Sequence, residues 1–157
     1  MIEEFMAFAE GESPFDFERF TPYPEEFRRL DDVAAAWDRE RAENPGKVES
    51  ARPRDGYNAG GYEWCVANWG TKWRAFHVDR KEPEPCDREG SWQVVIHLDT
   101  AWSPPLPVIL RASELFTKLD FELRYFECGN AFNGMFCCRG GEVSYDESGP
   151  YFGERGG

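Results

Sequence analysis

The chain has 157 residues, a net charge of −12 and an aromatic content of 16%. A chain of this length forms one domain and can bury a hydrophobic core without a disulfide or a metal. Its acidity argues against the cationic surface that nucleic-acid binders and proteins on anionic membranes need, and it has no apolar run long enough for a membrane span. We therefore expect no direct nucleic-acid binding and no membrane association.

The five cysteines are scattered and odd in number. Secreted disulfide scaffolds are shorter and denser in cysteine, so free thiols in a reducing compartment are expected here. The first residues do not have the pattern of a secretory signal peptide. These observations predict a cytoplasmic protein.

Helical spacing dominates the first 43 residues. Apolar residues recur every three or four positions over 2–9, which predicts a short helix. The loosely alternating run 15–20 is compatible with a strand. Pro24, followed by two glutamates, marks the start of a longer helix with a core face of Phe27, Leu30, Ala34 and Trp37.

The middle of the chain contains a segment rich in residues that interrupt helices and strands, followed by segments in which apolar and polar residues alternate. The segment 44–61 is rich in Gly, Pro and Asn, which predicts a long loop. Strands are expected over 72–80 and 92–100, joined by a polar hairpin loop at 82–90. The second of these has the clearest pattern, with one apolar face and one polar face. The residues of its apolar face are Trp92, Val94, Ile96 and Leu98.

In the last third of the chain, one further expected helix is followed by segments in which apolar and polar residues alternate. Ser103 can cap a helix over 104–118, because the two prolines that follow suit a first turn. Strands follow over 121–127, 132–138 and 143–145, and the Gly-rich residues 148–157 predict a flexible tail. Successive strands without intervening helices require antiparallel pairing. The order predicts one α+β domain over 1–147, in which 92–98 and 121–127 share a sheet and the helices cover one face.

Two motifs resemble a known family. The first is Trp-Cys-Val-Ala-Asn-Trp-Gly-Thr-Lys-Trp at 64–73, and the second is Asp-Thr-Ala-Trp-Ser-Pro-Pro at 99–105. Together they are similar to a phage- and plasmid-encoded family of unknown function with an Asn-Trp-Gly-Thr-Lys-Trp signature. The segment 125–134 resembles that family's Glu-x-Gly stretch, so the resemblance covers roughly 15–145.

The resemblance implies a ferredoxin-like α+β sandwich, a name for a topology that implies no iron–sulfur cluster. Members of that family begin with a strand before their first helix, whereas this chain begins with the helix at 2–9. The comparison therefore implies that one strand of the sheet is missing or comes from elsewhere.

The two motifs supply the candidate binding site. Aromatic rings beside amide, hydroxyl and ammonium groups suit recognition of a ligand. The same residue types also suit a structural turn with Gly70 at positive φ, and we favour that interpretation. We expect Trp69 or Trp73 to contact Trp102, with these rings mostly buried. The candidate residues are Asn68, Trp69, Thr71, Lys72, Trp73 and Trp102.

Metal binding and catalysis have little support in the sequence. Cys137 and Cys138 are adjacent, so in a strand they point to opposite faces, and the other cysteines lack a partner at zinc or iron–sulfur spacing. His77 and His97 belong to no nucleophile signature. We expect no metal, no cofactor and no catalytic residue.

The negative charge is concentrated in residues 1–50, with 14 acidic and 6 basic side chains. We expect a small acidic, non-catalytic protein of a phage or plasmid that binds an unidentified host or phage protein. One alternative is a DNA mimic that antagonises a host defence nuclease, although interleaved arginines favour a solvated surface. Another is an enzyme with a pocket lined by tryptophans.

Overall fold

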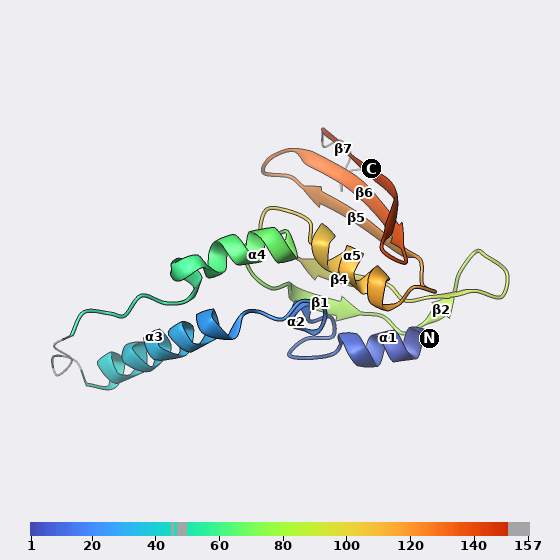
Figure 1. The fold of residues 1–157 in the computed structure, drawn as a ribbon. Coiled ribbons are helices and arrows are strands. Elements are labelled where there is room, and N and C mark those ends of the chain that lie inside the picture. Colours follow the sequence, from blue (N-terminus) through green and yellow to red (C-terminus); the bar gives the residue numbers. More distant parts are fainter. Residues whose placement is uncertain (45, 47–49, 151–157) are drawn as a thin grey trace.

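The fold is of the α+β class, as the sequence predicts. The computed structural model describes residues 1–44, 46 and 50–150 (Figure 1). In chain order the elements are α1 (Ile2–Ala9), α2 (Phe17–Phe20), α3 (Glu25–Glu43), the π-helical turn η1 (Tyr57–Gly61), α4 (Tyr62–Trp69), β1 (Phe76–Arg80), β2 (Glu84–Pro85), β3 (Trp92–Gln93), β4 (Ile96–Asp99), α5 (Leu106–Leu115), β5 (Phe121–Glu127), β6 (Phe132–Arg139) and β7 (Glu142–Pro150).

The strands form three antiparallel groups. β5, β6 and β7 make a three-stranded sheet, β1 pairs with β4, and β2 pairs with β3. The expected antiparallel pairing is confirmed, but the expectation that 92–98 and 121–127 share one sheet is wrong. Alternation determines which face of a strand is buried and says nothing of which strand lies beside it.

The expected strand 92–100 is divided in two. Trp92 belongs to β3 and is 59% exposed, whereas Val94, Ile96 and Leu98 pack against the core. Only the last two of these three residues lie in β4. The apolar face is therefore confirmed for three of its four residues.

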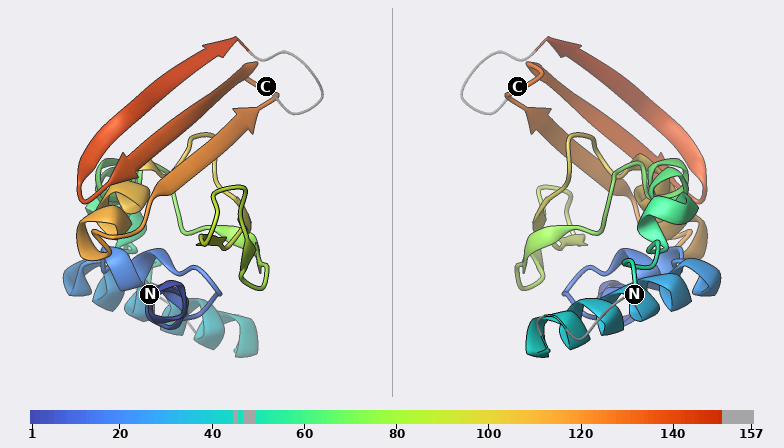
Figure 2. Two further views of the ribbon diagram at one scale, coloured as in Figure 1. Left: turned by 90° about the vertical axis from the view of Figure 1, so that its right-hand side faces the viewer. Right: turned by 90° about the vertical axis from the view of Figure 1, so that its left-hand side faces the viewer.

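The core joins the N-terminal helices to α5 and one face of the β5–β7 sheet. Phe5 of α1 makes edge-to-face contacts with Phe116 and Phe121, at centroid distances of 5.3 and 5.5 Å. Cys138 of β6 packs on α5, with its Sγ 3.8 Å from the Ile109 carbonyl oxygen. Figure 2 shows the three-stranded sheet extending past α5, away from α1 and α3.

The run 15–20 forms α2, so the strand interpretation is wrong. Asp16 caps this helix, because its Oδ1 accepts a hydrogen bond of 3.1 Å from the Glu18 N–H. Such a local cap favours a helical turn over extended backbone. Phe17 and Phe20 are then three residues apart and both enter the core.

The long helix is confirmed, but it lies largely outside the core. α3 extends away from the body in Figure 1, and Ala34 is its buried residue, while Leu30 of the expected core face is exposed. Part of the expected loop 44–61 is helical, because residues 57–61 form the π-helical turn η1. Residues 45 and 47–49 of that loop lie outside the described residues.

Two other expectations change with the structure. The segment 62–69, for which the sequence pattern predicts no element, is the helix α4, which ends where Gly70 adopts φ of 78°. The positive φ of Gly70 is as expected, since glycine commonly ends a helix in this conformation. β7 continues to Pro150, so 148–150 are part of a strand, and the remainder of the expected tail, 151–157, lies outside the described residues.

Candidate functional site

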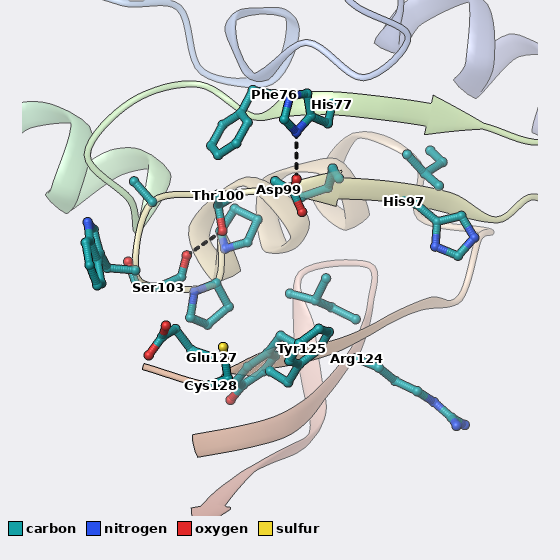
Figure 3. Close-up of a pocket in the computed structure, with 18 of the residues that line it drawn as sticks. Phe76, His77, His97, Asp99, Thr100, Ser103, Arg124, Tyr125, Glu127 and Cys128 are labelled. Carbon is teal, nitrogen blue, oxygen red and sulfur yellow. Dashed lines mark hydrogen bonds and ion pairs between the residues drawn. The ribbon is translucent and has the colours of Figure 1, made fainter. Parts of the chain in front are cut away.

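A cleft of about 880 Å³ lies between the β1–β4 pair and strand β5. Its walls come from the start of β1, from β4 and the corner that follows it, and from β5 (Figure 3). Figure 3 shows His77 and Asp99 on one side of this cleft, and Tyr125, Glu127 and Cys128 on the other. A volume of this size is typical of sites that hold a ligand or a segment of chain.

Two of the cleft residues have strained backbones. His77 and Trp102 have φ of 49° and 67°, a conformation uncommon for residues other than glycine. His77 lies at a break in the β1–β4 register, between the pairs of Phe76 and Asp79, and such bulges redirect side chains. Strain of this kind persists where the surrounding structure enforces it, and it clusters at binding sites.

The redirected imidazole spans the two strands. Nδ1 of His77 lies 2.9 Å from Oδ2 of Asp99, and both side chains are exposed (Figure 3). An imidazole held by a carboxylate has a defined orientation, which can serve recognition or proton transfer. The pair is therefore an oriented polar group in the cleft.

The corner between β4 and α5 is fixed by the turn that follows α4. The Ser103 hydroxyl donates a hydrogen bond of 2.6 Å to the Gly70 carbonyl oxygen, and the Thr100 hydroxyl donates one of 2.8 Å to the Ser103 carbonyl oxygen. A Cβ on Gly70 would lie 2.7 Å from Cδ of Pro107, so only glycine fits there. The two sequence motifs thus interlock and set the shape of the cleft wall.

Three of the six predicted site residues have structural roles. The Asn68 amide donates to the Trp64 carbonyl oxygen at 2.9 Å, near the end of α4. Trp69 is buried and donates a hydrogen bond of 2.8 Å to the Thr21 carbonyl oxygen. Thr71 is buried against Ala101. The contacts of Asn68, Trp69 and Thr71 are those of a structural turn, the interpretation that we favour from the sequence.

Trp73 and Trp102 line the cleft, and they depart from the expectation that the rings are mostly buried. Trp102 is 58% exposed and Trp73 is 46% exposed. The ammonium of Lys72 lies 5.4 Å from the centroid of the Trp102 ring, a cation–π geometry. The positive φ of Trp102 accompanies this outward placement, and the expectation of burial for Trp73 and Trp102 is wrong.

Four further cleft residues were not among the predicted site residues: Phe76, Asp99, Tyr125 and Glu127. Asp99 opens the motif at 99–105, and Tyr125 and Glu127 lie in the segment 125–134, but only the approach of β4 and β5 brings them to one cleft. Burial raises the pKa of Tyr125, and the charge of Asp146 raises it further. Glu127 accepts hydrogen bonds from the backbone N–H groups of the turn that follows β5.

Among the described residues, no group of three or more His, Cys, Asp or Glu side chains is placed to hold a metal ion. The expectation that the chain binds no metal or cofactor stays a prediction. In the described part of the chain, every helix is too short or too polar to cross a bilayer. The cleft itself offers exposed aromatic rings, the imidazole of His77 held by Asp99, the carboxylate of Glu127 and the phenol of Tyr125.

Comparison with known proteins shows that the C-terminal part of the chain is similar to a known protein family. The family model described as "Ferredoxin-like domain in Api92-like protein" matches residues 84–152. The search of curated proteins and the search of solved structures gave no match. The motif at 99–105 lies within the matched segment, and the motif at 64–73 precedes it. The chain therefore contains a ferredoxin-like domain similar to that of Api92-like proteins, within an α+β fold.

Proposed function

We propose that the chain is a non-catalytic protein-binding module and that its cleft receives part of another protein. One observation carries the proposal: four large aromatic side chains with more than two fifths of their surface exposed line the same cleft. They are Trp73, Phe76, Trp102 and Phe126. Exposed rings gathered at a concave site are typical of protein interfaces, where Trp contributes disproportionately to affinity.

The origin and the cellular location that we propose for the protein rest on the sequence. The motif resemblance supports an origin in a phage or plasmid, and five free thiols support a cytoplasmic location. Binding would need little rearrangement, because the Thr71 and Ser103 hydrogen bonds already fix the corner that carries Trp102. The partner is then a protein of the host or of the phage.

The experiment is capture of partners from a lysate of the natural host, followed by their identification. We expect a stoichiometric partner with the wild-type chain, and its loss with the double variant Trp73→Ala/Trp102→Ala. The matched control is Trp92→Ala, because Trp92 is equally exposed but lies outside the cleft. Retention of the partner by a folded double variant, or loss with the control, contradicts the proposal.

An enzyme is the second candidate, and one observation favours it. The His77–Asp99 pair lies in the cleft with the geometry of a general base held by a carboxylate. If the cleft were catalytic, His77→Gln would abolish turnover while partner capture persisted. Loss of capture with His77→Gln and no turnover of any substrate favours the binding module instead.

The DNA-mimic alternative has less support. Acidic side chains on and near α3 are paired with arginines: Glu25 with Arg29 at 3.3 Å, and Asp38 with Arg52 at 2.9 Å. Such pairing interrupts a continuous array of carboxylates. A mimic needs that array to replace the phosphates of DNA.

A further inference from the structure

The cleft separates the edges of two sheets. β4 pairs with β1 on one side, and β5 pairs with β6 on one side, so each is the last strand of its sheet toward the cleft. Residues 96–105 and 123–128 line the cleft without interruption. Alternate residues of a strand point to opposite faces, so a cavity lined by consecutive residues lies against the edge of the strand.

The two edges run in the same direction. In Figure 3, β4 passes from His97 to Asp99 and β5 passes from Arg124 to Glu127, both toward the same end of the cleft. This is the direction expected when a strand, a helix and a second strand follow one another, as β4, α5 and β5 do. A strand lying antiparallel to both edges would join β1–β4 and β5–β7 into one continuous sheet.

The volume suits one strand. A strand residue occupies about 160 Å³ of a sheet, taking about 3.3 Å of rise, a strand spacing of about 4.8 Å and a thickness of about 10 Å. The cleft of about 880 Å³ therefore accommodates about five residues. β4 lines the cleft with four residues and β5 lines it with five.

We propose that the cleft receives one β-strand from a basic partner protein, which pairs with β4 and β5. The strand would place alternate apolar side chains on the half-buried floor formed by Ile96, Leu98 and Leu123. This mode of binding draws affinity from main-chain hydrogen bonds and specificity from alternate side chains. The inference rests on the proposed function, and it specifies the form of the partner.

Charge determines the choice of partner. The carboxylates of Asp99 and Glu127 line the cleft, Arg124 of the same lining is paired with Glu122 at 2.8 Å, and the chain as a whole carries −12. Basic side chains on the outward face of the strand would complement this field. A second copy of the chain carries the same −12 and is repelled, which disfavours self-association through these edges.

The probe is an end-blocked seven-residue peptide of alternating Val and Lys, titrated against the full chain by calorimetry. We expect binding, together with slowed amide hydrogen exchange in 96–99 and 123–127. The same peptide with N-methylated backbone amides keeps the side chains but cannot pair, so its binding should be lost. A peptide of alternating Val and Glu should bind more weakly.

Matched charge variants locate the interaction. Asp99→Asn should weaken binding of the Val/Lys peptide by about two- to fivefold, the range for an exposed ion pair. Asp87→Asn makes the same charge change in an exposed loop outside the cleft, and it should leave affinity unchanged. A circular dichroism spectrum and melting temperature identical to the wild type establish that both variants are folded.

Four results overturn the inference: no binding of the Val/Lys peptide, equal binding of the N-methylated peptide, protection outside the two edges, or dimerisation of the chain through these edges. Failure of the inference is distinguishable from failure of the proposed function. If only the inference fails, the chain still captures a partner through Trp73 and Trp102, but amide hydrogen exchange at the strand edges is not slowed. If the proposed function fails, the chain captures no partner through these tryptophans.

Discussion

Thr71 holds both backbone groups of Ala101. The Thr71 hydroxyl donates to the Ala101 carbonyl oxygen and accepts from the Ala101 N–H, each at 3.1 Å, and both residues are buried. The two residues are 30 positions apart, one after α4 and the other at the corner before α5. This single side chain therefore fixes the wall of the cleft that carries Trp102.

We expect Thr71→Val to destabilise the protein although it conserves volume. It would leave a buried N–H and a buried carbonyl oxygen without their partner, and each such loss costs about 1–3 kcal/mol. For a chain of this size the two losses together should lower the melting temperature by about 4–24 °C. Thr71→Ser, which keeps the hydroxyl, is the control. An unchanged melting temperature for the valine variant would show that this pair carries no stability.

Trp69 and Trp102 should respond differently to truncation. Trp69→Ala removes a ring that is 97% buried and should cost about 3–5 kcal/mol. Trp102→Ala should leave the melting temperature almost unchanged, because its ring is largely exposed. The burial of Trp102 that the sequence predicts would instead give a strong loss of stability for Trp102→Ala. Thermal denaturation of both variants decides the matter, and equal losses would contradict the exposed placement of Trp102.

The packing of η1 on α3 depends on Gly56. A Cβ at this position would lie 1.9 Å from the Phe27 carbonyl oxygen, although the φ of −64° suits any residue. Gly56→Ala should therefore separate the two segments and cost about 1–3 kcal/mol through overpacking.

Gly149→Ala is the matched control, since a Cβ there meets no atom of the described residues within 4 Å. We expect its melting temperature to equal that of the wild type or to exceed it slightly. Hydrogen exchange at 57–61 should accelerate in Gly56→Ala alone. Exchange that is unchanged at 57–61 would show that the contact with Phe27 does not hold η1.

Alkaline pH should destabilise the fold. Burial raises the pKa of the Cys65 thiol to about 11, and the charge of Asp31 adds to this effect. The thiol of the unfolded chain ionises first, near its ordinary value. The free energy of unfolding should therefore be fully present below about pH 8.5 and decrease as pH rises toward about 11.

Urea denaturation at a series of pH values measures this decrease. Cys65→Ala should make the decrease shallower. It should persist in part, because burial also raises the pKa of Tyr23 and of Cys138. Cys128→Ala is the control, because Cys128 is exposed. A profile that Cys65→Ala does not alter would contradict this origin of the pH dependence.

The absence of a metal is testable by elemental analysis. We expect protein purified without chelator to contain no stoichiometric zinc or iron, because the cysteines lack the spacing that such sites need. One metal ion per chain, lost on Cys137→Ser or Cys138→Ser, would contradict the prediction.

Local features of the fold were predictable from the sequence. The spacing of apolar residues predicts α1 and α3, and prolines after Ser103 predict the start of α5. Alternation predicts β5 and β6, and the paired glycines at 140–141 predict the turn before β7. Each of these depends on residues close together in the chain, so the physical cause is contained in a short segment.

The site depended on contacts between distant segments. Nothing in the alternation of 96–99 indicates that β4 pairs with β1 and lies across a cleft from β5. The exposure of Trp102 follows from a positive φ and from the hydrogen bonds of its corner, which join residues about 30 positions apart. The sequence by itself thus determined α1, α3 and α5, the alternation of β5 and β6, and the negative charge. Only the tertiary structure decided which strands are neighbours and which rings reach solvent, because pairing and burial are properties of the packed chain and of no single segment.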